Sequence, residues 1–285
     1  MVERDQEVTQ PPRRARRPSR SVIYRRRLVA LGVVAAGFLV AWFAVGKLRG
    51  GSDEQATTAP VVPPRPFRVV FPEGFTRVQM AARVAAVARI AQQERGKRPK
   101  LAAAQYLAAT RRRRREPAFG TRRFPLEGFL FPATYQFTAR TSSAQLVAAQ
   151  LEAFRRNWAK VGLGYARSKN LTPYDVLTIA SMVEKEARVS EERPLVSAVI
   201  YNRLHRHMAL QIDSTLRYGL HIPPTESIRQ SELNSQNAYN TRHRLGLPPT
   251  PIANPGLASI EAAAHPAHVD YLFFVRKPDH VHHFF

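Results

Sequence analysis

The sequence has 285 residues, enough for one sizeable domain with its own hydrophobic core and a smaller unit beside it. It contains no cysteine, which excludes thiolate catalysis and cysteine-ligated zinc. The formal net charge of +23, carried mainly by arginine, indicates an anionic partner: nucleic acid, acidic lipid or an acidic polymer.

The N-terminal region predicts a single membrane anchor. Residues 1–27 are polar and basic and predict a disordered cytoplasmic tail, and the apolar run of 19 residues at 28–46 has about the length of a transmembrane helix. A cleaved signal peptide is the alternative, but Lys47-Leu48-Arg49 follows instead of small residues at a cleavage site. Nine arginines precede the run, so the N-terminus is expected in the cytoplasm and the rest of the chain outside it, where nucleic acid is normally absent.

Residues 47–66 are rich in Gly, Thr and Pro and predict an extended linker. A strand at 67–71, an amphipathic helix from Thr76 and a short helix at about 101–109 predict a small unit over residues 67–115. In the first helix, the spacing predicts an apolar face of Val78, Ala81, Ala82, Ala85, Val87 and Ala88.

The five arginines at 111–115 mark the end of this unit. They form either a binding site for an anionic polymer or a solvent-exposed charged surface, and the second interpretation is favoured. The main domain is then expected at 116–285, with helical periodicity at 144–158.

Three signals predict that a helix begins near residue 172. Thr172 suits the N-cap, Pro173 the first helical position and Asp175 the first turn. At 100° per residue, the apolar face of this helix is centred on Val176, Ile179, Ala180, Val183 and Ala187.

Glu184 and Glu186 fall on the two opposite margins of this face, and Lys185 points away from it. Partial burial raises the pKa of a carboxyl, and an acid still protonated near neutral pH is the donor that glycosidic bond cleavage requires. The alternative is that both glutamates only solvate the edge of a buried helix, and the spacing alone favours it. Periodicity does not choose between the two glutamates.

A series of motifs follows in fixed order: ASMVEKE at 180–186, ERP at 192–194, NRL at 202–204, LQIDST at 210–215, AYNT at 238–241, GLPPTPIANPG at 246–256 and AAAHP at 262–266. LEGFLFPATY at 126–135 precedes them, and a strand-like segment at 271–275 follows. Their order and gaps resemble those of the membrane-anchored endolytic murein transglycosylase family, also called YceG-like. The resemblance extends from about residue 67 to the end of the chain.

The resemblance implies a mixed α+β catalytic domain that cuts glycan strands of peptidoglycan between N-acetylmuramic acid and N-acetylglucosamine. The reaction is an intramolecular transfer that leaves a 1,6-anhydro muramyl end, so the enzyme is a lytic transglycosylase that needs no cofactor and no metal. The second carboxylate of the Glu-Lys-Glu triplet, Glu186, is implied as the acid and then the base, with Glu184 as runner-up. The implied partners are glycan strands, the inner membrane and peptidoglycan synthases, with action on nascent strands that limits their length.

Further polar residues are candidates for contacts with the glycan. Gln211, Asp213, Tyr239 and Asn240 are expected along the groove with Glu184, although their alternative role is turn and loop structure. Glu127 either supports the groove from behind or lies in a plain turn.

Two other features have weaker implications. Residues 72–76 (PEGFT) resemble the LysM-like part of the family, a module type associated with N-acetylglucosamine polymers, and the alternative is a packing unit that braces the catalytic domain. The terminal histidines, His265, His268, His280, His282 and His283, lack the helical spacing of a zinc hydrolase, so no metal site is expected. His283-Phe284 resembles the family's terminal histidine beside an aromatic strand.

Three departures from the family pattern stand out. Ala133 replaces an acidic residue, Ser214 replaces a proline, and the chain stops at Phe285 where relatives continue, so a truncated catalytic domain is expected. Two alternative functions remain: a catalytically inactive glycan-binding scaffold of the synthesis machinery, and a nucleic-acid or acidic-lipid binder. The second requires the large domain to lie in the cytoplasm.

Overall fold

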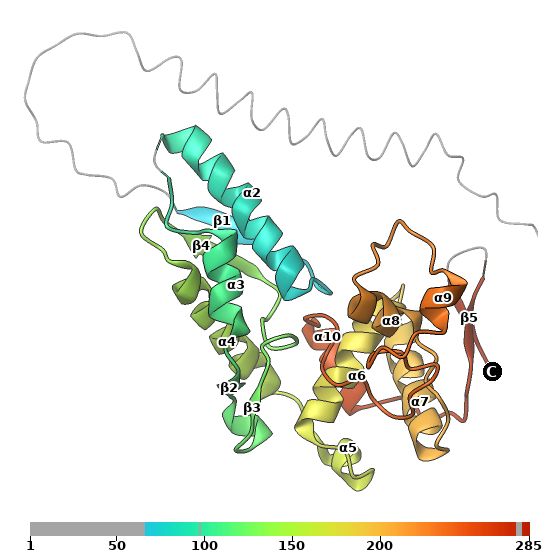
Figure 1. Cartoon of the computed structure of the whole chain (residues 1–285). Coiled ribbons are helices and arrows are strands. Elements are labelled where there is room, and N and C mark those ends of the chain that lie inside the picture. Colours follow the sequence, from blue (N-terminus) through green and yellow to red (C-terminus); the bar gives the residue numbers. More distant parts are fainter. Residues whose placement is uncertain (1–65, 97, 278–280) are drawn as a thin grey trace, which may run out of the picture. The chain divides into compact units, whose positions relative to one another are not determined.

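The computed structural model describes residues 66–96, 98–277 and 281–285, which belong to one compact unit (Figure 1). The predicted cytoplasmic tail, the predicted transmembrane helix at 28–46 and the linker up to residue 65 lie outside the described residues. Among the helices that are described, none combines the length and hydrophobicity that a membrane crossing requires. The described elements are mixed α and β, as the sequence predicted.

The unit begins with the expected strand, helix and helix. They are β1 (Phe67–Val70), α2 (Arg77–Arg95) and α3 (Ala103–Arg111). Thr76 is the N-cap of α2: its hydroxyl accepts a hydrogen bond from the Gln79 amide, and the Gln79 side chain accepts one from the Thr76 amide. This capping box satisfies two amides that the first helical turn leaves free.

Helix α2 buries a face that matches the predicted one only in part. Of the predicted residues, Ala81 is buried and Val87 and Ala88 pack against the core, whereas Val78 and Ala82 are exposed. Met80 and Val84, outside the predicted face, are also buried. Alanine and valine occur on all sides of this helix, so hydrophobicity alone does not define its inner face. Packing against α3 decides it, and the buried Tyr106 hydroxyl of α3 lies 3.4 Å from the sulfur of Met80.

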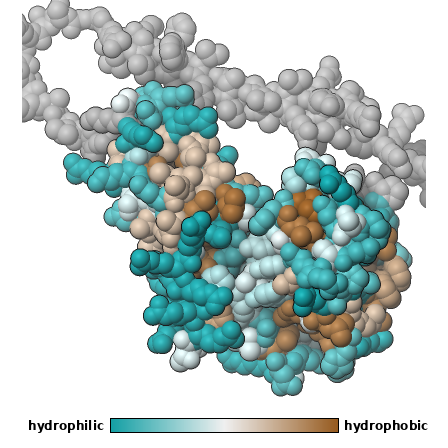
Figure 2. All heavy atoms as spheres, in the orientation of Figure 1, coloured by the Kyte–Doolittle hydropathy of each residue, from teal (hydrophilic) through white to brown (hydrophobic). Residues whose placement is uncertain are grey.

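A two-stranded sheet joins this segment to the chain that follows it. β1 pairs antiparallel with β4 (Thr134–Phe137), with Phe67 opposite Phe137. Between them lie β2 (Arg114–Arg115), the 3-10 helix η1 (Pro117–Phe119) and β3 (Arg123–Phe124), which pairs with β2. The surface over this short hairpin is strongly hydrophilic (Figure 2). α4 (Ser143–Trp158) then packs against α3.

The second half is mainly helical. Its elements are α5 (Gly164–Ser168), α6 (Pro173–Glu186), α7 (Glu192–His205), α8 (Asp213–Leu220), α9 (Gln230–Leu233), α10 (Leu257–Ala264), β5 (Phe274–Arg276) and β6 (His282–Phe284). β5 and β6 form an antiparallel hairpin at the end of the chain, and the strand expected at 271–275 begins only at Phe274.

Helix α6 lies at the centre of this half. It packs against α10, α7 and α8 (Figure 1), and every residue from Val176 to Val183 is buried. The predicted apolar face is therefore part of a helix that is enclosed on all sides over two turns. Burial decreases at both ends: residues 173–175 are partly exposed in the first turn, and in the last turn Glu184 and Glu186 are partly exposed and Lys185 is exposed.

Gly128 fixes a close approach between two loops that flank α6. Its φ is +90°, and a Cβ atom there would lie 2.7 Å from Pro251 Cγ and 3.2 Å from Leu177 Cδ2. Gly246 has a similar φ of +84° but no heavy atom within 4 Å of the Cβ position. Both positions therefore have a backbone conformation that favours glycine, but only Gly128 also lacks room for a Cβ atom.

We predict that Gly128→Ala destabilises the fold more than Gly246→Ala. Both substitutions force alanine into a left-handed conformation, at a cost of about 1 kcal/mol, and Gly128→Ala adds about 1–3 kcal/mol of overpacking. Urea unfolding of both variants measures the difference. Equal free energies of unfolding would contradict the close approach.

Candidate functional site

The sequence signals for the start of α6 are confirmed. The Thr172 hydroxyl accepts a hydrogen bond from the Asp175 amide at 3.2 Å, and the Asp175 carboxylate accepts one from the Thr172 amide at 2.8 Å. Pro173 occupies the first helical position, where its missing N–H costs nothing. Helix α6 then continues to Glu186, so both glutamates lie in its last turn.

Glu186 is the last residue of α6, and its carboxyl faces the first turn of α8. Burial raises its pKa, the hydroxyl and amide of Ser214 lower it, the charge of Asp213 raises it, and His282 lowers it, with a net effect upward. The Ser214 hydroxyl is buried beside this carboxyl. Burial is the largest of these effects, so the pKa of Glu186 stays above its ordinary value.

The two helix ends act on this carboxyl in opposite directions. At the C-terminus of α6 the peptide dipoles favour a neutral side chain, whereas the free amide of Ser214, in the first turn of α8, favours a carboxylate. The two influences on the pKa of Glu186 therefore partly cancel, and burial leaves the pKa raised overall.

Glu184 lies on the other side of α6, as the periodicity predicted. Its Oε2 accepts a hydrogen bond from the Gly256 amide at 3.0 Å, at the N-terminus of α10. A Cβ atom on Gly74 would lie 3.4 Å from Glu184 Cγ, so the turn after β1 also packs on this side chain. The Glu73 carboxylate occupies the space that a Gly256 side chain would need. Glu184 therefore braces two loops.

Asp213 is the first residue of α8 and lies near Glu186, and Gln211 precedes it by two residues. Asp213 is exposed and pairs with Arg242, with 2.6 Å between Oδ1 and Nη2. Gln211 is exposed and has a φ of +55°, which is uncommon for a residue with a side chain. Such conformations persist where the surroundings hold them, and they cluster at functional sites.

Tyr239 and Asn240 occupy the loop that follows α9. Tyr239 is partly exposed, its hydroxyl lies 2.8 Å from that of Thr250, and its ring meets the Tyr218 ring of α8 edge-on at 5.1 Å. Asn240 is fully buried, and its amide group donates to the carbonyls of Leu233 and Ser235. Asn240 therefore holds the loop that carries Tyr239.

Glu127 is a buried carboxyl that anchors the far end of α8. Burial raises its pKa to about 7, although hydrogen bonds from the Arg77 amide, the Tyr218 hydroxyl and the Asn254 side chain act in the opposite direction. Only 2% of its surface is exposed. The structure thus places Glu127 behind α8, and not in a plain surface turn.

The sequence analysis did not identify the pair formed by Glu192 and His282. His282 is buried, and both its amide and its Nδ1 contact the carboxylate of Glu192, the latter at 3.1 Å. Burial raises the pKa of Glu192, but hydrogen bonds from the Arg188 and His282 amides and from the imidazole outweigh it and lower the pKa overall. The pair ties β6 to the first turn of α7 and brings an imidazole near Glu186.

His283, which we had likened to the family's terminal histidine, is exposed, so His282 occupies the inner position. The alternation of side chains along a strand could have indicated this, because residues 282 and 284 lie on one face of β6 and residue 283 lies on the other.

Two further polar residues were not singled out. Asn254 is fully buried: its Oδ1 accepts from the Gly128 and Leu130 amides, and its Nδ2 donates to Glu127 and to the Phe75 carbonyl. Arg203 is also buried and donates to the carbonyls of Leu210 and Leu272 at 2.9 and 2.6 Å. Both hold loops in place around α6 and α8.

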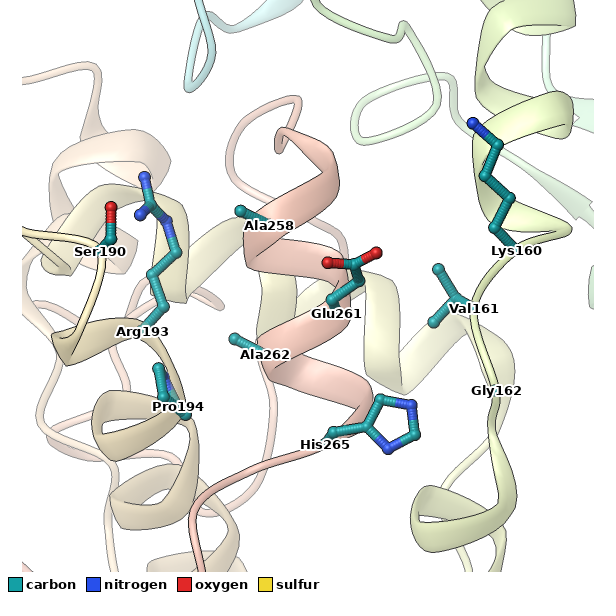
Figure 3. Close-up of a pocket in the computed structure, with 10 residues that line it drawn as sticks. All are labelled: Lys160, Val161, Gly162, Ser190, Arg193, Pro194, Ala258, Glu261, Ala262 and His265. Carbon is teal, nitrogen blue, oxygen red and sulfur yellow. The ribbon is translucent and has the colours of Figure 1, made fainter.

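A pocket of about 460 Å³ lies along α10 and does not include Glu186 in its lining. Glu261 of that helix and His265 just after its end line it, with Arg193 on one side and Lys160 on the other (Figure 3). Among the described residues, no group of three or more potential metal-ligating side chains comes together, and His280 lies outside them.

Comparison with known proteins identifies the family. Residues 44–285 match the model of the YceG-like family. The chain belongs to the YceG-like family. A crystal structure of a yceG-like protein from Listeria monocytogenes is similar, with 30% sequence identity and a TM-score of 0.62 over 80% of this chain and 74% of that one. The α+β fold described above is therefore shared with a solved YceG-like structure.

Two curated relatives carry the name endolytic murein transglycosylase. The one from Bacillus subtilis is 36% identical over 155 residues, and the one from Streptococcus pneumoniae is 39% identical over 160. These matches cover 54% of this YceG-like chain, but only 42% and 28% of the two relatives. The chain thus spans less than half the length of the curated relatives that it matches.

We predict that Glu127 makes the fold less stable as pH rises from about 4.5 to about 7. The folded protein holds a proton on this carboxyl in that range, whereas the unfolded chain, with an ordinary pKa of 4.5, releases it. The free energy of unfolding should therefore fall with rising pH, by at most about 3 kcal/mol from this group.

Unfolding of wild type and Glu127→Gln between pH 4 and 8 measures this contribution. The variant keeps a hydrogen-bonding side chain but cannot ionise, so its stability should fall less over this range. Glu152→Gln, which alters an exposed glutamate, is the matched control. Parallel pH profiles for wild type and Glu127→Gln would refute the assignment.

Proposed function

We propose that this chain is an endolytic peptidoglycan transglycosylase in which Glu186 is the catalytic acid and base. Family membership and the names of the two curated relatives support the activity. The observation that carries the residue assignment is the raised pKa of Glu186 between two helix ends, beside Ser214. By contrast, Glu184 is engaged by the Gly256 amide and packs against a neighbouring loop.

In the proposed reaction, the protonated Glu186 gives its proton to the glycosidic oxygen between N-acetylmuramic acid and N-acetylglucosamine. The bond from C1 to that oxygen breaks, and the acetamido group of the substrate stabilises the developing cation. The carboxylate then removes the proton from the C6 hydroxyl, whose oxygen bonds to C1. The product is a 1,6-anhydro muramyl end, no water is consumed, and Glu186 is again protonated.

The glycan would lie across the start of α8. Asp213 and Gln211 are exposed there, and Tyr239 is partly exposed on the loop that packs against α8, so all three offer hydrogen bonds to sugar hydroxyls and acetamides. Asn240 and Glu127 act from behind by holding the Tyr239 loop and α8. Residues 67–115 serve as a LysM-like support that contacts the glycan beyond the cleavage site.

The predicted helix at 28–46 anchors the enzyme in the inner membrane with its N-terminus in the cytoplasm. The catalytic part is then outside, beside peptidoglycan synthases, where cutting nascent strands limits their length. The excess of positive charge suits the anionic lipid surface and the acidic wall polymer.

We predict that Glu186→Gln abolishes formation of 1,6-anhydro ends and that Glu184→Gln retains it. Loss of a positioned acid and base should lower the rate by about 10²–10⁴-fold. The assay digests purified peptidoglycan with the whole chain and counts anhydro ends by mass spectrometry. Circular dichroism of both variants verifies folding.

Three outcomes are informative. Loss with Glu184→Gln alone would overturn the residue assignment. Cleavage at the wild-type rate by Glu186→Gln would overturn the chemistry. Glycan binding by wild type without anhydro products would favour the inactive scaffold.

We also predict that the C-terminus lies outside the cytoplasm. A reporter enzyme that works only outside the cytoplasm should therefore be active when it is fused after Phe285. The charge difference across residues 28–46 is the physical reason. A cytoplasmic signal would instead favour the nucleic-acid or acidic-lipid binder.

A further inference from the structure

A second pocket, of about 870 Å³, lies at the beginning of α6, at the opposite end of this helix from Glu186. Its wall is aromatic, with Tyr165, Tyr174 and Tyr201, and the Gly-Leu-Pro-Pro loop closes one side with Pro248 and Pro249. Twelve residues separate Tyr174 from Glu186 along the helix, which is about 18 Å at 1.5 Å per residue. The proposed cleavage site and this pocket are therefore separate.

Tyr174 provides an unused hydrogen-bonding group in this pocket. Its ring stacks on Phe124 with 4.3 Å between the ring centroids, which fixes its position. Its hydroxyl is buried and has no hydrogen-bond partner among the described residues. A buried hydroxyl without a partner is costly, and a ligand that accepts its hydrogen bond removes that cost.

The charged side chains of the pocket are mainly cationic. Arg122 and Lys169 line it and form no ion pair within the described residues, and each lies over an aromatic ring, at 5.7 and 5.6 Å. His205 and His207 are exposed at its edge. The one acidic lining residue, Asp175, is already engaged by the amide and hydroxyl of Thr172.

The arginine-rich hairpin continues this positive charge. Arg111–Arg115, Arg122 and Arg123 are all exposed, and none of them makes an ion pair with a described residue. Arg113 and Arg122 lie close enough to Tyr174 for their charges to act on its hydroxyl. The hydrophilic surface over this hairpin in Figure 2 therefore borders the pocket.

We propose that this pocket binds a carboxylate-bearing peptide, and that this peptide is the stem of peptidoglycan. Arg122 and Lys169 bind its carboxylates, the Tyr174 hydroxyl donates to a carboxylate or carbonyl oxygen, and its aliphatic side chains pack on the tyrosine rings. The choice of the stem peptide rests on the proposed function. Because the pocket is remote from Glu186, it binds a substituent carried along the strand and not the sugars being cleaved.

A binding experiment tests the pocket without relying on catalysis. The probe is the synthetic pentapeptide L-Ala-D-Glu-L-Lys-D-Ala-D-Ala, titrated calorimetrically into the whole 285-residue chain. The double variant Arg122→Gln/Lys169→Gln should bind at least about tenfold more weakly, because two charge-assisted hydrogen bonds are lost. The matched control, Arg167→Gln/Arg206→Gln, removes two neighbouring exposed charges outside the pocket lining and should bind as wild type does.

Tyr174→Phe separates a ligand-binding role from a structural one. It should weaken binding severalfold without lowering the melting temperature, because the hydroxyl that it removes has no partner in the folded protein. A lowered melting temperature with unchanged binding would mean that the hydroxyl supports the fold instead.

A cleavage assay distinguishes the pocket from the proposed function. Wild type should cut peptide-bearing strands at a lower KM than strands stripped of peptide by an amidase, and the double variant should lose this difference while kcat stays unchanged. No cleavage of either strand, with pentapeptide binding retained, would overturn the proposed function alone. No pentapeptide binding, or equal binding by wild type and the double variant, would overturn the pocket assignment.

Discussion

The enclosure of α6 is the constraint on which the rest of the structure depends. Its residues from Val176 to Val183 are buried on every side, so neither the rotation nor the position of the helix along its axis is free. A rotation by one residue, 100°, would bring Lys185 into the positions that its neighbours occupy and bury its charge. The core thus aims Glu186 at α8 and Glu184 at α10.

The site around Glu186 is assembled by buried polar residues that satisfy loop backbones. Asn254 joins the loops at Phe75, Gly128 and Leu130, and it also contacts Glu127, which in turn holds Tyr218 of α8. The N-terminus of α8 then presents Ser214 to Glu186. Removing one of these partners leaves others buried and unsatisfied, so their contributions are not independent. The surroundings of Glu186 therefore depend on contacts made some distance away.

Local signals in the sequence predicted those features that local interactions determine. Thr172, Pro173 and Asp175 located the start of α6, and the helical period then located Glu184 and Glu186 on opposite margins. The face of α2 was predicted only in part, because alanine and valine surround that helix and packing against α3 distinguishes its sides. Local signals suffice to predict the buried face of a helix when its polar and apolar residues lie on clearly different sides.

Interactions between distant residues were beyond such reasoning. The pairing of Phe67 with Phe137, the contact of Glu192 with His282 and the four hydrogen bonds of Asn254 join segments separated by 70 or more residues. The hydrophobic periodicity of a sequence does not predict which loop a buried asparagine side chain will contact. Asn240 illustrates the same limit, because its sequence suited both a groove and a turn, and only the Leu233 and Ser235 carbonyls reveal how its amide is used.

The two ends of α6 restrict what a ligand of this protein can be. Because a helix enclosed on all sides cannot shorten or bend without breaking its packing, Tyr174 and Glu186 stay about 18 Å apart, at 1.5 Å per residue. A small molecule occupies one end only. In the proposed assignment a polymer with side branches occupies both ends, with its backbone at the carboxyl end of α6 and a branch in the aromatic pocket. Binding of the branch then lowers the KM for the polymer, and the rigid helix holds the two binding positions in one register.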